Sequence, residues 1–126
     1  MKFVILGSPR TKKTAQRIIK VKGRPMIVPS KVTCKWANDA QLQLQAQFGK
    51  YRGQTFHDRQ RWNLRALFYR PSNTTADLVN HLQALCDALQ AAGVVSNDRW
   101  IAGFDGSRLL LDAKLPRVEL WLDELP

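Results

Sequence analysis

In residues 62–69, WNLRALFY, every second side chain is apolar, and the residues between them are of mixed polarity. In an extended strand this pattern places an apolar set on one face. That set is Trp62, Leu64, Ala66 and Phe68. The other face carries Asn63, Arg65, Leu67 and Tyr69. The segment therefore predicts a sheet strand with one face against a hydrophobic core, and the core needs further elements to cover that face.

Two amphipathic stretches predict the helices of that covering layer. In residues 31–48 one helical face collects Trp36, Ala40, Leu44 and Phe48. In residues 76–92 the apolar stripe is Leu78, Leu82, Leu85, Cys86 and Leu89. The turn before the second helix offers Thr74 or Thr75 as an N-cap. Gly93 predicts its end.

The remaining segments predict short strands. They are a strand at 3–6, a hairpin of 17–21 and 25–28 around a Gly-containing turn, and strands at 101–104, 109–111 and 117–122. The order is strand, hairpin, helix, strand, helix, strands, without an internal repeat. It predicts the α+β class, with two main helices packed on a small mixed sheet. At 126 residues the chain is long enough for one domain, 1–126, and one core.

The charge of the chain is concentrated at one end. The formal net charge is +10, from 20 basic and 10 acidic residues. Residues 1–38 contain ten basic residues and no acid, whereas residues 39–126 contain ten of each. This asymmetry predicts a polyanionic partner, first of all nucleic acid bound in a salt-sensitive way. An acidic protein is the alternative. An anionic membrane surface is disfavoured, because no segment reads as a basic amphipathic helix with an aromatic apolar face.

Compartment signals are few. No run approaches the roughly 18 apolar residues of a membrane span. The short apolar run near the N-terminus fits a strand better than a signal peptide. The two cysteines, Cys34 and Cys86, predict buried thiols and not a metal site. We expect a cytoplasmic protein.

Three acidic positions are candidates for a metal site. Asp77 and Asn80 are three residues apart, so both can point to one spot at the start of the second helix. Mg²⁺ prefers such carboxylate and amide oxygens. Asp98 could supply a second carboxylate if the chain returns beside this helix. Each has an ordinary alternative: Asp77 as a helix cap, and Asp98 and Asp105 as turn residues.

Several segments together resemble the RusA-type Holliday junction resolvases, a family of endodeoxyribonucleases common in phages and prophages. The N-terminal FVILGSPRTKK is similar to the family's first strand, its Gly-x-Pro turn and its following basic residue. Residues 76–98, ADLVNHLQALCDALQAAGVVSND, are similar to its Asp-x-Asp-Asn-Leu…Lys…Asp-Ala-Leu…Gly…Asp-Asp signature. The closing DGSR…PRVEL is similar to the end of many phage members. The resemblance covers nearly the whole chain.

The resemblance implies a homodimer that binds four-way DNA junctions and resolves them by paired, symmetric, Mg²⁺-dependent nicks in DNA recombination and repair. It places the family's first catalytic Asp on Asp77, the adjoining Asn on Asn80, the helix Asp on Asp87 and the last Asp of the acidic pair on Asp98. We therefore expect Asp77, Asp98 and Asn80 to be catalytic. Asp77 and Asp98 are the expected primary Mg²⁺ ligands, with Asp87 and Asp105 as auxiliary ligands.

The chain departs from the family pattern at three positions. Val79 stands where the family has its second aspartate, Gln83 where it has a lysine, and Asn97 where it has the first Asp of the acidic pair. Asp105 or Asp87 could replace the missing carboxylate, and for Asp105 this requires proximity to Asp77 and Asp98. The departures keep an alternative open, a junction-binding or structural DNA-binding protein with weakened catalysis.

Basic residues of the N-terminal third are the expected contacts to the DNA backbone. The positioning set is Lys12, Lys13, Arg17, Lys20, Lys22 and Arg24, with Arg70 added because it precedes the second helix. Of the two histidines, His81 borders the apolar stripe and is expected to be packed and hydrogen-bonded. His57 lies in a polar loop and is expected to be solvated.

Overall fold

The computed structural model describes residues 1–11, 16–29, 31–51, 59–73 and 77–126; for 16–21, 26–29 and 31–34 it describes the backbone alone. The elements are β1 (Lys2–Leu6), β2 (Gln16–Val21), β3 (Arg24–Pro29), α1 (Lys31–Phe48), η2 (Gly49–Tyr51), β4 (Arg61–Arg70), α2 (Leu78–Ala91), η3 (Asp98–Trp100), β5 (Ile101–Gly103), β6 (Arg108–Leu111) and β7 (Arg117–Leu125).

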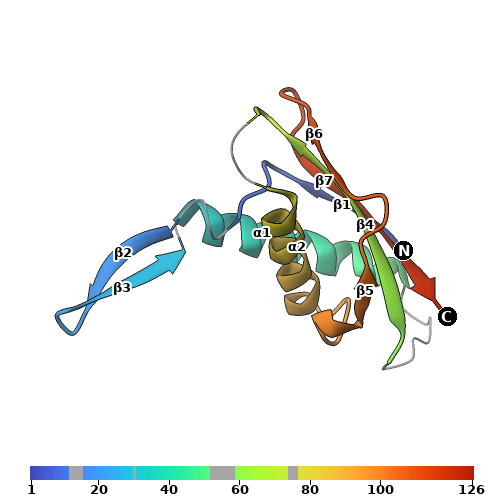
Figure 1. The fold of residues 1–126 in the computed structure, drawn as a ribbon, viewed down its shortest axis with the longest axis horizontal. Helices are drawn as coiled ribbons and strands as arrows, with labels where there is room; N and C mark the ends of the chain where they lie inside the picture. The colour runs from blue at the N-terminus through green and yellow to red at the C-terminus, as the bar shows by residue number, and fades with distance from the viewer. Residues whose placement is uncertain (12–15, 30, 52–58, 74–76) are drawn as a thin grey trace.

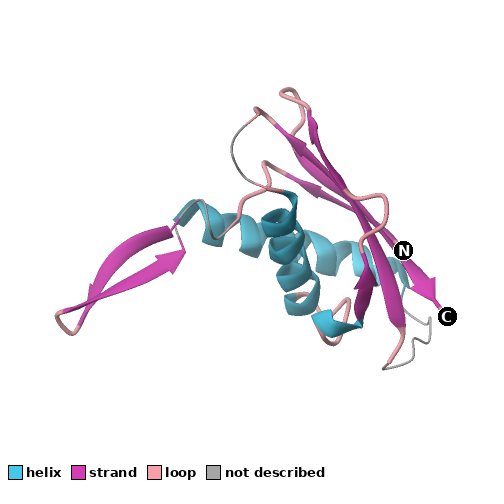
Figure 2. Ribbon diagram, in the orientation of Figure 1, coloured by secondary structure: helices cyan, strands magenta, loops and turns pink. Residues whose placement is uncertain are grey.

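The main sheet has five strands and is mixed. Its path is β1-β7-β4-β5, and β6 also pairs with β4. β7 runs antiparallel to both β1 and β4, whereas β5 and β6 run parallel to β4. Both long helices lie on one face of this sheet, and no helix among the described residues lies on the other (Figure 1, Figure 2). This single small domain confirms the predicted α+β fold, with two helices packed on a mixed sheet.

The core lies between the helices and the sheet. The whole predicted apolar face of β4 is buried, and so are Phe3 and Ile5 of β1. From the helices, Trp36, Ala40 and Leu44 of α1 and the stripe from Leu82 to Leu89 of α2 pack against it. The period-two and period-3.6 patterns predicted these contacts correctly, because each amphipathic element has one face to bury.

The limits of α2 follow from its caps. The helix begins at Leu78, and Asp77 is the N-cap: its backbone is extended and its carboxylate accepts the Asn80 N–H at 2.9 Å. The expectation that Thr74 or Thr75 caps this helix is therefore wrong, and both threonines lie outside the described residues. At the other end Gly93, with φ of 75°, donates to the Gln90 carbonyl at 3.1 Å. This confirms the predicted end of the helix.

Side chains of α1 and η2 occupy the outer edge of β1. The Val4 N–H donates to Gln47 Oε1 at 2.8 Å, and Gln47 Nε2 donates to the Val4 carbonyl at 2.7 Å. Gln43 makes the same pair of bonds with Leu6, and the Tyr51 hydroxyl does so with Lys2. Four residues of a helix rise about 6 Å and two residues of a strand about 6.6 Å. Every fourth residue from position 43 to 51 can therefore reach every second residue of β1.

Strands β2 and β3 form a separate two-stranded sheet that projects away from the helices and the main sheet (Figure 1). We call this hairpin the arm. Its turn consists of Lys22 and Gly23, with φ of 52° and 77°. Two positive φ values in a two-residue loop match the right-handed twist of the flanking strands. The arm confirms the predicted hairpin.

Candidate nucleic-acid interface and acidic site

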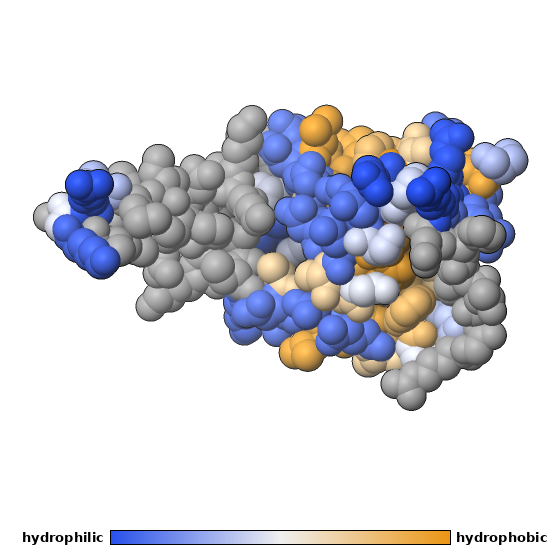
Figure 3. Space-filling view, turned by 90° about the horizontal axis from the view of Figure 1, so that it is seen from below, coloured by the Kyte–Doolittle hydropathy of each residue, from blue (hydrophilic) through white to orange (hydrophobic). Residues whose placement is uncertain are grey.

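The tip of the arm is an exposed cationic surface. Lys22 and Arg24 are both exposed, and Figure 3 shows this end of the molecule as strongly hydrophilic. Among the described residues Lys22 is the only non-glycine with a positive φ. A side chain with a Cβ is uncommon in that region of φ/ψ space, where Asn, Asp and Gly are favoured.

Two further residues of the predicted DNA-contacting set lie on β2, where the structure describes the backbone alone. Arg17 and Lys20 lie on β2, opposite Val28 and Pro25 of β3. Their side chains fall outside the described part of the chain, and so do residues Lys12 and Lys13 entirely.

Arg70 ends β4 and lies near the start of α2, as predicted. Only 7% of it is exposed, and its Nη2 donates to Asn73 Oδ1 at 3.5 Å. Its positive charge acts on the neighbouring His81, whose pKa it helps to lower. In this chain Arg70 is therefore a largely covered cation beneath the helix start.

The first turn of α2 presents an exposed carboxylate over a buried imidazole. Asp77 is exposed, whereas His81 is 2% exposed, with Nδ1 at 2.8 Å from the Asp77 carbonyl oxygen and its ring edge-on to Phe68. Because that carbonyl can only accept, Nδ1 carries the proton. Burial lowers the pKa of His81, and the charge of Arg70 lowers it further. The expectation of a packed, hydrogen-bonded His81 is confirmed.

Asp98 lies at the other end of α2. It begins η3, and its N–H donates to Gln90 Oε1 at 3.1 Å, so the chain does return beside this helix. Asn97 caps the 3-10 turn by accepting the Arg99 N–H at 3.0 Å.

The carboxylates of Asp98 and Asp87 both act on the Cys86 thiol. Burial is the main cause that raises the pKa of Cys86, to about 12, and the two negative charges add to it. Because only a thiolate is a strong nucleophile or metal ligand, Cys86 is an inert core thiol. This agrees with its predicted burial.

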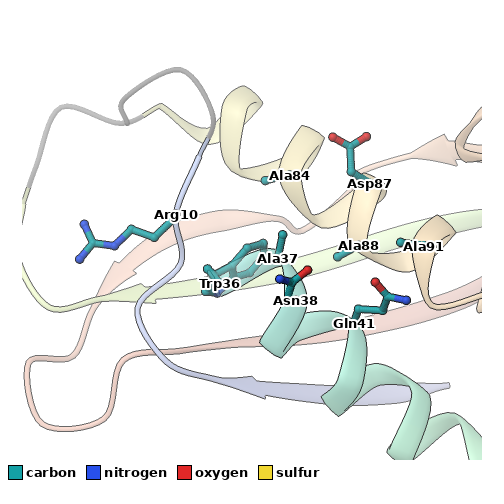
Figure 4. A pocket seen from close by; sticks show the side chains of 9 residues that line it. All are labelled: Arg10, Trp36, Ala37, Asn38, Gln41, Ala84, Asp87, Ala88 and Ala91. Carbon is teal, nitrogen blue, oxygen red and sulfur yellow. The ribbon is translucent and has the colours of Figure 1, made fainter. Parts of the chain in front are cut away.

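Asp87 stands at the rim of a groove of about 150 Å³ between α1 and α2 (Figure 4). Alanines of both helices form much of its lining, namely Ala37, Ala84, Ala88 and Ala91. In Figure 4 the Arg10 guanidinium extends to the left, away from the helices, and the Asp87 carboxylate points up from α2, so neither points toward the other. Asp87 Oδ1 accepts from Gln83 Nε2 at 3.0 Å, so a neutral amide contacts this carboxylate.

Asp105 belongs to the loop between β5 and β6. Its N–H donates to Asn63 Oδ1 at 3.0 Å and its carbonyl accepts from Asn63 Nδ2 at 3.2 Å. Asn63 alternates with the buried residues of β4 and so belongs to the sheet face that the helices leave open. Asp105 is therefore held from the side of the sheet opposite α2.

The four expected Mg²⁺ ligands are not gathered in one place. Asp77 and Gln90 are 13 residues apart on one helix, which is about 20 Å along its axis, and Asp98 is hydrogen-bonded to Gln90. Among the described residues, which include all four aspartates, no group of three or more His, Cys, Asp or Glu side chains could hold a metal ion. Asp77 and Asp98 of one chain are therefore too far apart to hold the same Mg²⁺.

The open face of the sheet carries a row of side chains that sequence reasoning missed. Trp121 of β7 is in register with Lys2 of β1 and Arg65 of β4. The Arg65 Cζ lies 4.0 Å from the centre of the Trp121 ring, and Lys2 Nζ lies 5.3 Å from it. We call these three residues the Trp121 row. Alternation places each of them on one face of its strand, but the register between strands is not readable from one sequence.

Across the described residues, no helix is both long and apolar enough to cross a membrane. The sequence matches no protein-family model, and no curated protein is significantly similar to it.

Proposed function

We propose that this chain is a structure-specific endodeoxyribonuclease that binds four-way DNA junctions and resolves them by paired symmetric nicks with Mg²⁺, in DNA recombination and repair. The observation that carries the proposal is the arm, a hairpin that projects from the domain and exposes Lys22 and Arg24 at its tip. It belongs to the segment that holds ten basic residues and no acid.

The arm suits the DNA backbone for two reasons. Lys22 and Arg24 lie at the tip of the projecting hairpin, away from the acidic residues of the helices and the main sheet, so they can neutralise phosphates and release counterions. Lys22 also occupies a backbone conformation that costs a non-glycine residue of order 1 kcal/mol. This lysine therefore adds a charge at the tip of the arm at some cost to the stability of the turn.

Cutting would depend on Asp77, Asp98 and Asn80. One chain holds the two aspartates at opposite ends of α2, so we propose that the homodimer is the working unit. Two copies related by a twofold axis would also match the symmetry of a junction and present one acidic site to each of two opposed strands.

The test is cleavage of a labelled four-way junction, with and without Mg²⁺, beside a linear duplex. Asp77→Asn removes the carboxylate but keeps the helix, because Asn is as good an N-cap as Asp. We expect paired nicks on the junction alone, reduced at least about 100-fold by Asp77→Asn and by Asp98→Asn. Asp39→Asn, an exposed aspartate on α1, is the matched control and should cut normally. Equal cutting by Asp77→Asn would contradict the proposed role.

A second candidate is a junction-binding protein that does not cut. Val79 favours it, because this side chain is 73% exposed in the first turn of α2 at the position of the family's second aspartate. Val79→Asp should cost little stability, since the residue is exposed and a carboxylate is favourable near a helix N-terminus. Tight junction binding with nicking gained in Val79→Asp, and not in Val79→Asn, would support this candidate.

A further inference from the structure

We propose that the open face of the main sheet binds an unpaired DNA strand, with bases stacked at the Trp121 row and phosphates held by Lys2 and Arg65. This goes beyond the proposed function, because the surface is separate from the arm and from the acidic ends of α2. It does not depend on nicking.

The Trp121 row combines the two chemistries that an unpaired strand needs. The Trp121 ring, with the Arg65 guanidinium 4.0 Å from its centre, offers flat surfaces for bases. Arg65 and Lys2 add positive charge for the phosphates on either side. Neither cation forms an ion pair with any described residue, so both charges are available to a ligand.

The row is held in place before any ligand arrives. A Cβ on Gly106 would lie only 2.6 Å from Arg65 Cδ, so the β5–β6 loop packs directly on the Arg65 stem. The two hydrogen bonds between the Asn63 side chain and the backbone of Asp105, one donated by each residue, fix that loop. A side chain that is already ordered loses less entropy on binding.

The rest of this face carries both basic and acidic side chains. A second stack lies four residues along β7, where Arg117 Cζ is 3.8 Å from the centre of the Tyr69 ring. There Arg117 is paired with Asp112 at 2.8 Å and with Glu119 at 3.4 Å, so those charges largely offset one another. Arg61 of β4 and Asp123 of β7 share this face by the same alternation. The Trp121 row is therefore distinguished by the position of Arg65 and Lys2 over an aromatic ring and not by the net charge of the face.

The shape of the surface favours an unpaired strand over duplex. Bases inside a duplex already stack on one another and cannot reach a ring that lies on a strand of a sheet. An acidic peptide would use Lys2 and Arg65 but would have no need of an aromatic ring. A loss of binding when the Trp121 ring is removed is therefore expected for an unpaired strand, and not for a duplex or an acidic peptide.

The test measures binding of a labelled oligothymidine to the full chain by fluorescence anisotropy. We expect Trp121→Leu to weaken binding about tenfold, and Trp121→Phe, which keeps an aromatic ring, to stay within about twofold of the unchanged chain. Arg65→Gln should weaken binding as well. Arg99→Gln is its matched control, because Arg99 lies over Trp100 at 4.7 Å in η3 and not on this face.

Unchanged affinity in Trp121→Leu would overturn the proposal, and so would equal losses in Trp121→Leu and Trp121→Phe at an unchanged melting temperature. Equal competition by a blunt duplex or by an acidic peptide would overturn it too. The result is independent of the nuclease proposal: a chain that cuts no junction can still bind oligothymidine through Trp121. A chain that cuts junctions but does not bind oligothymidine contradicts this inference alone.

Discussion

At the residue scale, His81 links the stability of the fold to pH. Its burial in the core lowers its pKa from the ordinary 6.5, so the folded state binds the proton less tightly than the unfolded state. As the pH falls below about 6.5, the unfolded chain takes up a proton first, and stability is lost until the folded state is protonated too. His81 therefore contributes its full stability only above that ordinary value.

We expect His81→Gln to be less stable than the unchanged chain by about 1–2 kcal/mol at pH 8, because Gln packs less well against Phe68. Because the variant lacks this imidazole, the stability of His81→Gln should fall less than that of the unchanged chain between pH 8 and pH 5.5. Urea unfolding at both pH values measures this, and His57 is common to both proteins. Equal falls in the two proteins would show that His81 is not the titrating group.

At the scale of elements, α1 protects the edge of β1. Exposed strand edges pair with other chains, and here Gln43, Gln47 and Tyr51 satisfy the backbone groups in place of a neighbouring strand. We expect Gln47→Leu to lower the free energy of unfolding by about 2 kcal/mol, because it leaves the partly buried N–H and carbonyl of Val4 unpaired.

Gln45→Leu is the control for that substitution, because Gln45 is exposed on the same helix. It should change stability by less than about 0.5 kcal/mol. The double variant Gln43→Leu/Gln47→Leu should in addition associate at high concentration, which light scattering would detect. Indistinguishable unfolding curves for Gln45→Leu and Gln47→Leu would contradict the proposed pairing.

At the scale of the whole molecule, four of the ten basic residues of 1–38 lie on the arm, which contains no acidic residue. Lys22→Gln/Arg24→Gln should weaken junction binding and reduce the slope of log affinity against log salt by about 2, one for each lost phosphate contact. Lys35→Gln/Lys50→Gln removes the same charge from exposed positions on α1 and η2 and should reduce that slope much less. Equal slopes in the two double variants would mean that the arm makes no phosphate contacts.

Features that depend on neighbouring residues were predictable from the sequence. The buried face of β4, the stripe of α2, its end at Gly93 and the hairpin turn at Lys22 and Gly23 were all predictable, because each depends on residues close in the chain. The threonines before α2 were predicted as its N-cap and are not the cap, which is Asp77. Asp77 was a candidate for both cap and metal ligand; the structure shows the cap, and the ligand role stays a prediction.

The sequence by itself determined the fold class, the order of elements and the position of the charge, since periodicity and local turn chemistry are properties of neighbouring residues. Only the tertiary structure decided which distant side chains meet. It separated Asp77 from Asp98 by the length of α2, because a helix is a rigid spacer. It paired Gln43 and Gln47 with β1, and it aligned Lys2, Trp121 and Arg65 across three strands. Those contacts depend on register and packing between segments, and the sequence alone does not fix either.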